Sequence, residues 1–453
     1  MLETLKNAWK LPDLRRKIMY TLMILVIFRL GSAIPVPYLN AAAIGASGIF
    51  GDGNLMGYYN MLTGGALEQA SMFALSISPY ITASIVIQLL TVAIPYLENL
   101  AKEGEEGRKR INKITRYTGV ALAVLQSFAY YSMLRRGGAV VYTEGWESVF
   151  ACTVIVACFS AGAMFVMWLG ERIDAKGIGN GISMILFAGI VAGGKDLIQA
   201  LFIGRYADGG YAKGYIPAAI DAIKTEGFKW GGDAWFAVSV PVVAIIFLFV
   251  ITFIVVMYNA ERRIPVQYAK RVVGRKMYGG QSTHIPIKVN MSGVLPVIFS
   301  SSLLAIPGTL AAFFPAEEGT FWHGFVSLFN YDSWLYAVLY FLLIIAFNYF
   351  YVAIQYNPIE MANNLRKNNG AIPGIRPGKP TSDFIGKIIS KITIVGAFFL
   401  AFVAIMPIAI GAVSGLNISL GGTTIIIIVG VSLDTVRQLE SQMMMRHYKG
   451  FLE

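Results

Sequence analysis

Residues 60–90 read NMLTGGALEQASMFALSISPYITASIVIQLL, and this stretch decides the fold. Its second half belongs to an uncharged run, residues 74–95, which is long enough to cross the roughly 30 Å hydrocarbon core of a bilayer. The dozen residues before that run carry a Gly64-Gly65 pair and Glu68, and no hydrophilic loop separates them from it. Polar backbone in this position is tolerated at membrane depth only when protein or a water-filled cavity shields it. The pattern therefore predicts a segment folded back into a membrane protein, in front of a passage that it could close.

The composition of the whole chain supports this class. Of its 453 residues, 56% are hydrophobic and only 14% charged, and the mean hydropathy is +0.61. A soluble domain of this length is not that apolar, so the class is a polytopic membrane protein. Ten stretches qualify as spans: residues 18–34, 74–95, 117–134, 148–170, 181–193 (extended by 197–203), 236–258, 293–314, 335–355, 392–413 and 420–433.

Basic residues are distributed unequally between the two sets of predicted loops. The loops on the side of the two termini hold 29 of the 37 Lys and Arg residues, the opposite loops hold 7, and Arg29 lies inside the first span. Such an asymmetry predicts that both termini are cytoplasmic. Orientation alone explains most of the net charge of +11, although attraction of anionic lipid, RNA or an acidic protein remains an alternative.

No pattern in the chain indicates an enzyme, a metal site or a cofactor. The three histidines each stand alone in a loop or tail, with no metal-ligand spacing and no partners for a nucleophilic triad. The glycine-rich residues 177–181 follow a span instead of a strand and lack the spacing of a phosphate loop, so they predict a turn between helices. Cys152 and Cys158 lie six residues apart in one span, on different helix faces, which favours free thiols.

A secondary transporter of small solutes is the main alternative from the residues alone. Coupled transporters usually place ionisable residues within their spans. Here the interior polar residues are mostly neutral, and Arg29 is the exception. Because Arg29 lies near the end of its span, we expect it to snorkel or to cap carbonyl groups. A carrier is thus disfavoured, whereas a passive channel is not.

Four segments together resemble the SecY family of protein translocation channels. They are residues 60–90 and three further stretches, in order along the chain: GERIDAKGIGNGISMILFAGIVAG (170–193), AKRVVGRKMYGGQSTHIPIKVNMSGVLPVIF (269–299) and NPIEMANNLRKNNGAIPGIRPG (357–378). The similarity runs from the first span to the tail without a large gap, which makes it highly specific.

The resemblance implies an all-α polytopic membrane protein with ten transmembrane helices in two pseudo-symmetric five-helix halves and a re-entrant plug helix. The implied parts are a cytoplasmic segment (1–17), an N-terminal half (18–203, plug about 55–72), an extracytoplasmic connection (204–235), a C-terminal half (236–433, cytoplasmic loops 259–291 and 357–391) and a cytoplasmic tail (434–453). Within the plug, the resemblance points to Asn60, Thr63, Gly64, Gly65 and Glu68.

The resemblance also implies an apolar ring at the waist of the channel and a side exit. The implied ring residues are Ile77, Ile81, Leu186, Ile190, Ile298 and Ile427. The i, i+4 spacing within two of these pairs puts each pair on one helix face, but lipid-facing or packing residues have the same spacing. The side exit implied by the family lies between the second and third spans and the seventh and eighth, where the neutral polar residues are Gln88, Ser300, Ser301 and Ser302. Polar contacts between helices are the alternative role for these four.

The two long cytoplasmic loops resemble docking sites for a ribosome or for the SecA ATPase. The basic residues implied in docking are Arg262, Arg263, Arg271, Arg275, Arg366, Lys367 and Arg376, and Arg376 matches an essential loop arginine of the family. Phosphate contacts with ribosomal RNA would be salt-sensitive and largely independent of sequence.

By this resemblance the chain is a non-enzymatic, pore-forming subunit of a translocase in the cell membrane. It would pass unfolded secretory proteins and release signal peptides and transmembrane segments sideways into membrane lipid. The implied partners are small SecE and SecG subunits, the SecA motor, the translating ribosome and substrate preproteins. A partner or the membrane potential would supply the energy, because no nucleotide site is evident in the sequence.

Overall fold

The computed structural model describes most of the chain: residues 2–40, 43–44, 60, 63–198, 204–207, 210–213, 217, 234–268, 271–273, 276–278, 282–313, 320–329, 333–414 and 422–449. Several predicted features lie outside these residues. They include residues 55–59 and 61–62 of the plug, most of the connection 204–235, and Arg275.

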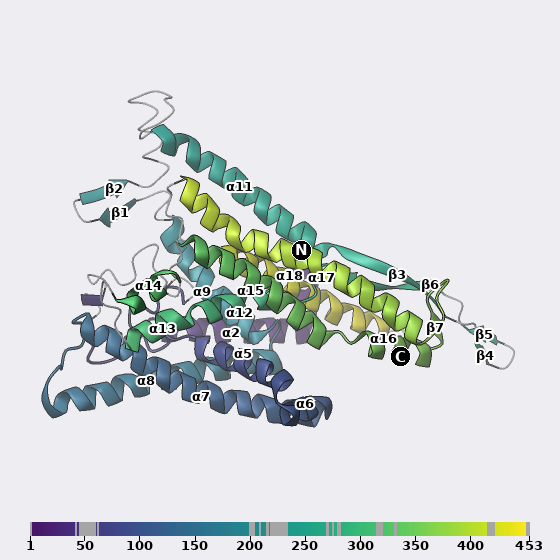
Figure 1. The fold of residues 1–453 in the computed structure, drawn as a ribbon, viewed down its shortest axis with the longest axis horizontal. Coiled ribbons are helices and arrows are strands. Elements are labelled where there is room, and N and C mark those ends of the chain that lie inside the picture. Colours follow the sequence, from purple (N-terminus) through teal and green to yellow (C-terminus); the bar gives the residue numbers. More distant parts are fainter. Residues whose placement is uncertain are drawn as a thin grey trace.

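The N-terminal part of the chain is a set of helices followed by a short hairpin (Figure 1). Its elements are α1 (Leu2–Lys10), α2 (Pro12–Gly31), α5 (Ser78–Ala93), α6 (Pro95–Lys102), α7 (Glu105–Arg136), α8 (Gly145–Lys176), α9 (Gly181–Ile198), β1 (Gly204–Ala207) and β2 (Gly210–Lys213). Proline begins α2 and α6, where a missing N–H group costs no helical hydrogen bond. The long helices α7 and α8 pack side by side and continue well past the predicted spans.

The C-terminal part combines helices with a small sheet at one end. Its elements are α11 (Ala234–Asn259), β3 (Glu261–Tyr268), β4 (Arg271–Val273), β5 (Lys276–Tyr278), β6 (Ser282–Lys288), α12 (Leu295–Leu304), α13 (Ile306–Phe313), α14 (Phe321–Ser327), α15 (Trp334–Gln355), α16 (Pro358–Lys367), β7 (Gly370–Ala371), α17 (Lys379–Ser414) and α18 (Gly422–Lys449).

Each of the ten predicted spans falls on a helix, but the helix boundaries differ from the predicted ones. Among the described residues, three helices are by themselves long and apolar enough to cross a membrane: Gly145–Lys176, Trp334–Lys367 and Lys379–Ile410. A fourth candidate is the pair Ser78–Ala93 and Pro95–Ala101, which is bent by 103°. The bend lies at Ile94, whose extended backbone is what a following proline favours.

Two predicted loops are largely helical. Residues 96–116 form α6 and the first turns of α7, and residues 171–176 complete α8. Hydropathy underestimates such helices because it finds the apolar part of a helix and misses its charged continuation. The seventh predicted span, in contrast, is divided into α12 and α13 at Ala305, shortly before Pro307.

The two long predicted loops 259–291 and 357–391 contribute strands to one sheet. Strand β3 pairs with β6 along Glu261–Gln267 and with β7 at Gln267 and Tyr268, all antiparallel, in the order β6-β3-β7. No strand is predicted in either loop from the sequence, and nothing in the sequence joins the two loops. Figure 1 shows this sheet extending beyond the end of α11, with the β4-β5 hairpin at its tip.

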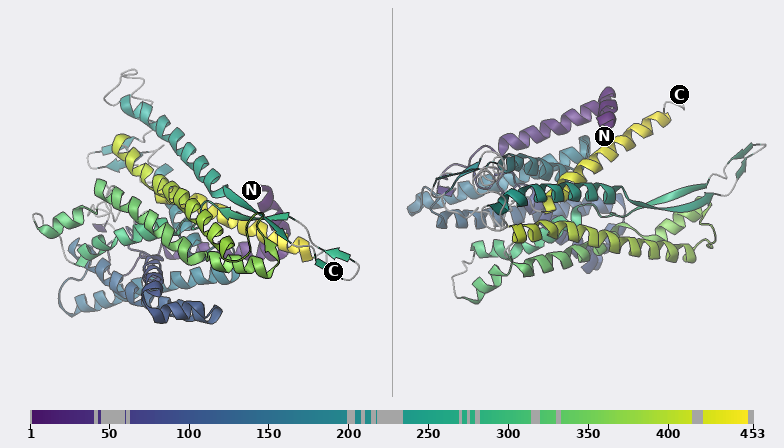
Figure 2. Two further views of the ribbon diagram at one scale, coloured as in Figure 1. Left: turned by 45° about the vertical axis from the view of Figure 1, so that its right-hand side comes forward. Right: turned by 90° about the horizontal axis from the view of Figure 1, so that it is seen from above.

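One large hydrophobic core joins helices from both parts of the chain, and the two parts touch along two seams. In the first seam α5 packs against α12 and α7 packs against α13. In the second seam α18 packs against α9 and α1. Figure 2 shows α1 at the N-terminal end of α2, near the C-terminal end of α18.

Candidate functional site

The six predicted ring residues all lie in the one core cluster that spans both halves. None of these side chains is more than 6% exposed. Ile77 and Ile81 come from the start of α5, Leu186 and Ile190 from α9, Ile298 from α12 and Ile427 from α18. Four helices that are distant in sequence thus bring aliphatic side chains into one buried cluster. Their role as a pore ring stays a prediction, because burial in a shared core also describes ordinary packing residues.

Close backbone contacts at two glycines help to set the positions of α9 and of Ile77 at the start of α5. A Cβ atom at Gly181 would lie only 1.9 Å from the Gly170 carbonyl oxygen, so glycine permits α9 to begin directly against α8. A Cβ atom at Gly170 would lie 3.3 Å from Ile77 Cδ1 and 3.4 Å from Ile185 Cδ1. The α8–α9 junction therefore sets the position of α9, and with it the positions of Leu186 and Ile190.

The segment before α5 is buried in large part, although Glu68 and Gln69 are exposed. Thr63 and Ser71 are buried, together with Ala66, Leu67 and Ala70. The described part, residues 63–77, is a series of turns, and Asn60 is in helical conformation. Gly64 and Gly65 have φ angles of 69° and 81°, which glycine adopts without strain.

Asn60 and Glu68 close this segment on itself. Asn60 Nδ2 donates to Glu68 Oε2 and the Glu68 backbone N–H donates to Asn60 Oδ1, both over 2.9 Å. The Asn60 carbonyl accepts from the Gly65 N–H at 2.8 Å and from Thr63 Oγ1 at 2.9 Å. These bonds join four of the five predicted plug residues, with Glu68 itself exposed, and they fix the fold of this segment locally.

Contacts from three other elements hold the segment in place. Arg29 Nη1 on α2 donates to the Gly64 carbonyl over 3.5 Å, and the buried Tyr130 hydroxyl on α7 donates to the Leu67 carbonyl. Residues 34–36 pair with residues 70–72 through two backbone bonds of 2.8 and 3.0 Å. From its place near the end of a span, Arg29 is expected to snorkel or to cap carbonyl groups. The structure shows it at a carbonyl of the candidate plug, which single-helix reasoning could not identify.

The predicted side-exit residues make their hydrogen bonds within their own helices. Gln88 Nε2 donates to Ser84 Oγ at 3.3 Å, Ser300 Oγ to the Pro296 carbonyl at 2.7 Å, and Ser301 Oγ to the Ile298 carbonyl at 2.9 Å. Ser302 is half-buried on the same helix. The hydrogen bonds observed for Gln88, Ser300 and Ser301 therefore do not cross the contact between α5 and α12.

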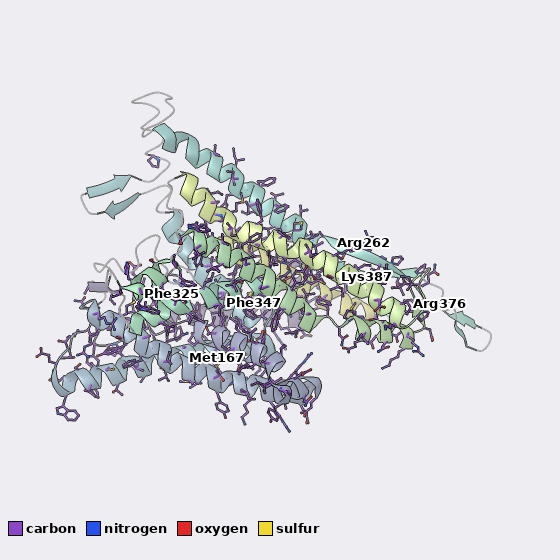
Figure 3. All side chains as sticks on the ribbon, in the orientation of Figure 1. Met167, Arg262, Phe325, Phe347, Arg376 and Lys387 are labelled. Carbon is purple, nitrogen blue, oxygen red and sulfur yellow. The ribbon has the colours of Figure 1, made fainter. Side chains whose placement is uncertain are left out.

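Those predicted docking residues that the structure describes lie on the β6-β3-β7 sheet or on elements next to it. Arg262 and Arg263 are exposed on β3, Arg366 and Lys367 are exposed in the last turn of α16, and Arg271 lies on β4. Figure 3 shows Arg262 and Arg376 at this end of the molecule, away from Met167 and Phe347 in the helical body. Arg263 Nε forms an ion pair with Glu261 at 2.7 Å, so its charge is partly neutralised.

The loop carrying Arg376 is shaped by glycines and anchored by a core. Gly374 and Gly378 have φ angles of 80° and 104°, and the Arg376 carbonyl accepts from Thr381 Oγ1 at 2.8 Å. Below the sheet lies a separate apolar cluster that includes Ile264 and Val266 of β3. The basic side chains are therefore displayed by an ordered platform instead of a free loop.

The glycine-rich residues 177–180 form a turn between α8 and α9, which confirms the helix-connecting interpretation. The Gly181 N–H donates to Asp174 Oδ1 at 2.7 Å, and the Ile178 N–H donates to Thr21 Oγ1 at 3.0 Å. The Gly179 N–H donates to Gln438 Oε1 on α18. Cys152 and Cys158 are free thiols, as predicted. Within the described residues, no group of three or more His, Cys, Asp or Glu side chains is arranged to hold a metal ion.

Known proteins match this arrangement in sequence and in fold. Residues 71–436 match the SecY family. The protein translocase subunit SecY of Streptomyces galbus is 43% identical over 467 aligned positions, which cover 100% of both chains. The chain belongs to the SecY family. The predicted resemblance and the predicted all-helical polytopic class are therefore confirmed.

Solved channel structures share the SecY fold of this chain at low sequence identity. One is a SecY protein whose plug domain stabilises the closed state of the translocation channel; its TM-score is 0.64 at 19% identity, over 94% of this chain and 92% of that one. Another is Sec61 in a canine ribosome-channel complex, with a TM-score of 0.57 at 17% identity over the same shares. SecY-family membership makes this chain a channel subunit of a translocase, and the small-solute transporter is not favoured.

Proposed function

We propose that this chain is the central pore-forming subunit of a Sec translocase in the cell membrane, with both termini cytoplasmic. It passes unfolded secretory proteins across the bilayer and releases apolar segments sideways into lipid. The observation that carries the proposal is the single buried cluster in which Ile81, Leu186, Ile298 and Ile427 meet from both halves of the chain. That cluster lies on the fold of known protein-conducting channels.

An aliphatic ring suits a channel for unfolded chains. A narrow apolar constriction stays dry and so excludes ions, which cannot be hydrated there. It offers a moving polypeptide no specific hydrogen bond that would arrest it. Residues 63–72, the described continuous part of the predicted plug, are held by Arg29 and Tyr130 and support closure.

Docking and energy supply come from partners. The platform formed by β3, β6, β7 and α16 receives the ribosome or the SecA ATPase through its exposed arginines. The solved ribosome-bound Sec61 channel supports the ribosome as a partner of this fold. Small SecE-like and SecG-like subunits complete the complex, and anionic phosphate groups of ribosomal RNA meet Arg262 and Arg376.

The direct test is to map where a translocating chain touches the protein. A secretory precursor is trapped in the reconstituted complex, and a photo-crosslinking residue is placed at Ile81, Ile298 or Ile427. Val86 on α5, which is 38% exposed, provides the matched control. We expect crosslinks from the three ring positions and none from Val86. Equal crosslinking at Val86, or none at the ring, would contradict the proposed path.

A further inference from the structure

The helix that carries ring residue Ile427 also reaches the cytoplasmic sheet. Helix α18 runs without a break from Gly422 to Lys449. Arg437 lies ten residues after Ile427, which is about 15 Å along the helix axis at 1.5 Å per residue. Helix α18 is continuous over this length and connects the ring with the level of the platform. A displacement of one end of the helix therefore also moves the other end.

Arg437 forms hydrogen bonds at the junction where helix α11 ends and the sheet begins. Its Nη2 atom donates to the Tyr258 carbonyl and, at 2.9 Å, to Asn259 Oδ1. These two residues end α11, and β3 begins at Glu261. The last carbonyls of a helix lack intrahelical partners and attract cations. A guanidinium there satisfies the carbonyl and the amide together, which favours one fixed geometry.

Other contacts around this junction are also close and charged. A Cβ atom at Gly430 would lie 2.6 Å from the Tyr258 hydroxyl oxygen, so α18 fits tightly against the end of α11. Lys288 on β6 stands opposite Glu261 on β3 in the strand register at the base of the hairpin, and Asp434 precedes Arg437 by one turn of α18. Although the Asp434 side chain reaches solvent, the surrounding protein raises the pKa of its carboxyl, and the charges of Lys288 and Arg437 oppose that shift.

The same turns of α18 contact the other half of the channel. Thr435 Oγ1 lies 3.6 Å from Met184 Sδ on α9, and Gln438 accepts from the Gly179 N–H. Met184 is two residues before ring residue Leu186. Residues 434–438 therefore touch the end of α11, directly before β3 begins, and a second helix of the ring.

From these contacts we propose that Arg437 is a positioning residue that couples docking to gating, an inference that rests on the proposed channel function. A partner that pushes or pulls the β3-β6 hairpin moves the end of α11. Arg437 transmits that movement to α18, and α18 displaces Ile427 from the ring. The ring then loosens without any contact between the partner and the ring itself.

The test uses the complete complex in vesicles, with SecA, ATP and a purified secretory precursor. SecA affinity and the translocation rate at saturating SecA are measured for R437Q, R437K and the matched control R116Q. Arg116 forms a bidentate ion pair with Glu171 at 2.8 Å, so R116Q also removes a cytoplasmic-side positive charge but stays within one half. A fourth variant combines R437Q with Ile298→Asn, which wets the ring directly.

We expect R437Q to lower the saturated rate by about fivefold or more while SecA affinity stays within about twofold, since coupling free energies are typically of that size. R437K should be intermediate, R116Q should match the wild type, and Ile298→Asn should restore the R437Q rate. A wild-type rate in R437Q would overturn the inference, as would a parallel loss of SecA affinity and rate that Ile298→Asn does not restore.

Two further outcomes remain informative. If R437Q does not accumulate, Asn259→Ala removes only one acceptor and should lower the rate in the same direction by a smaller factor; a wild-type rate would then overturn the coupling. Failure of the proposed function is distinguishable, because wild-type vesicles would then pass no precursor. Failure of the coupling alone leaves wild-type translocation intact.

Discussion

The two seams between the halves of this channel differ in their chemistry. In the first seam, where α5 meets α12, Gln88 and Ser300 bond within their own helices. In the second seam, α18 accepts hydrogen bonds from the other half: Gln442 from Lys17 Nζ at 3.1 Å and Gln438 from the Gly179 N–H. Of the described side chains, Gln88 and Ser300 thus do not bridge the first seam, whereas two side chains of α18 form directional bonds across the second.

This difference indicates which seam opens. Apolar side chains in a bilayer lose little when lipid replaces a neighbouring helix, because no hydrophobic driving force holds such helices together. A hydrogen-bonded seam loses its bonds when it parts. The α5–α12 side therefore suits a lateral exit into lipid, whereas the α18 side suits a hinge whose hydrogen bonds persist while α18 turns about them.

The largest effect is expected from a substitution that prevents docking, so that no partner acts on either seam. Arg376→Glu should reduce motor-driven translocation by about 100-fold, because like charges brought together at an interface cost several kcal/mol. Both seams should remain intact, so abundance and membrane insertion should match the wild type. Export assays in reconstituted vesicles check this, with Arg376→Lys as the conservative control. Normal export by Arg376→Glu would remove this residue from docking.

The second prediction introduces polar groups where the two halves meet. Ile81→Asn combined with Ile298→Asn should increase ion conductance of the closed channel about tenfold or more. Each amide offsets about 1–3 kcal/mol of the cost of wetting the ring. Conductance of purified channels in planar bilayers measures this effect. Val86→Asn, on the exposed face of α5, should not leak. A well-folded double variant with wild-type conductance would show that these residues pack without lining a pore.

The third prediction weakens the hydrogen-bonded seam. Gln438→Leu combined with Gln442→Leu removes two acceptors that α18 offers to the other half. At about 1 kcal/mol for each bond, the double variant should lose about 2 kcal/mol of stability. Thermal unfolding in detergent would measure it, together with precursor translocation, which we expect to fall. Unchanged unfolding and translocation would mean that these bonds do not hold the seam.

The smallest expected effect concerns the apolar seam. Gln88→Leu removes only a bond within α5, so stability should change by less than about 0.5 kcal/mol and the gate should still close. Signal-sequence selection and ion leak measured side by side test this, with Ser84→Ala as the control that removes the same bond from its other end. A strong leak would indicate that Gln88 bridges the two halves.

The sequence predicted the helical class, the spans and the identity of the family, because hydropathy and long motifs are local signals. It named six ring residues through the resemblance, and the structure brings all six into one core. The joined sheet was missed, because β7 consists of only Gly370 and Ala371 and carries no strand pattern. The Gly179–Gln438 bond was also missed, because its partners are 259 residues apart and each alone reads as a solvated polar group.

The most direct test of the two-seam account is a pair of distances measured in closed and substrate-engaged complexes. Spin labels at Leu89 on α5 and Ile306 on α13 report on the apolar seam, and labels at Arg16 on α2 and Met444 on α18 report on the hydrogen-bonded seam. The account predicts that a trapped precursor lengthens and broadens the first distance and leaves the second unchanged. Lengthening of the second distance with no change in the first would contradict it.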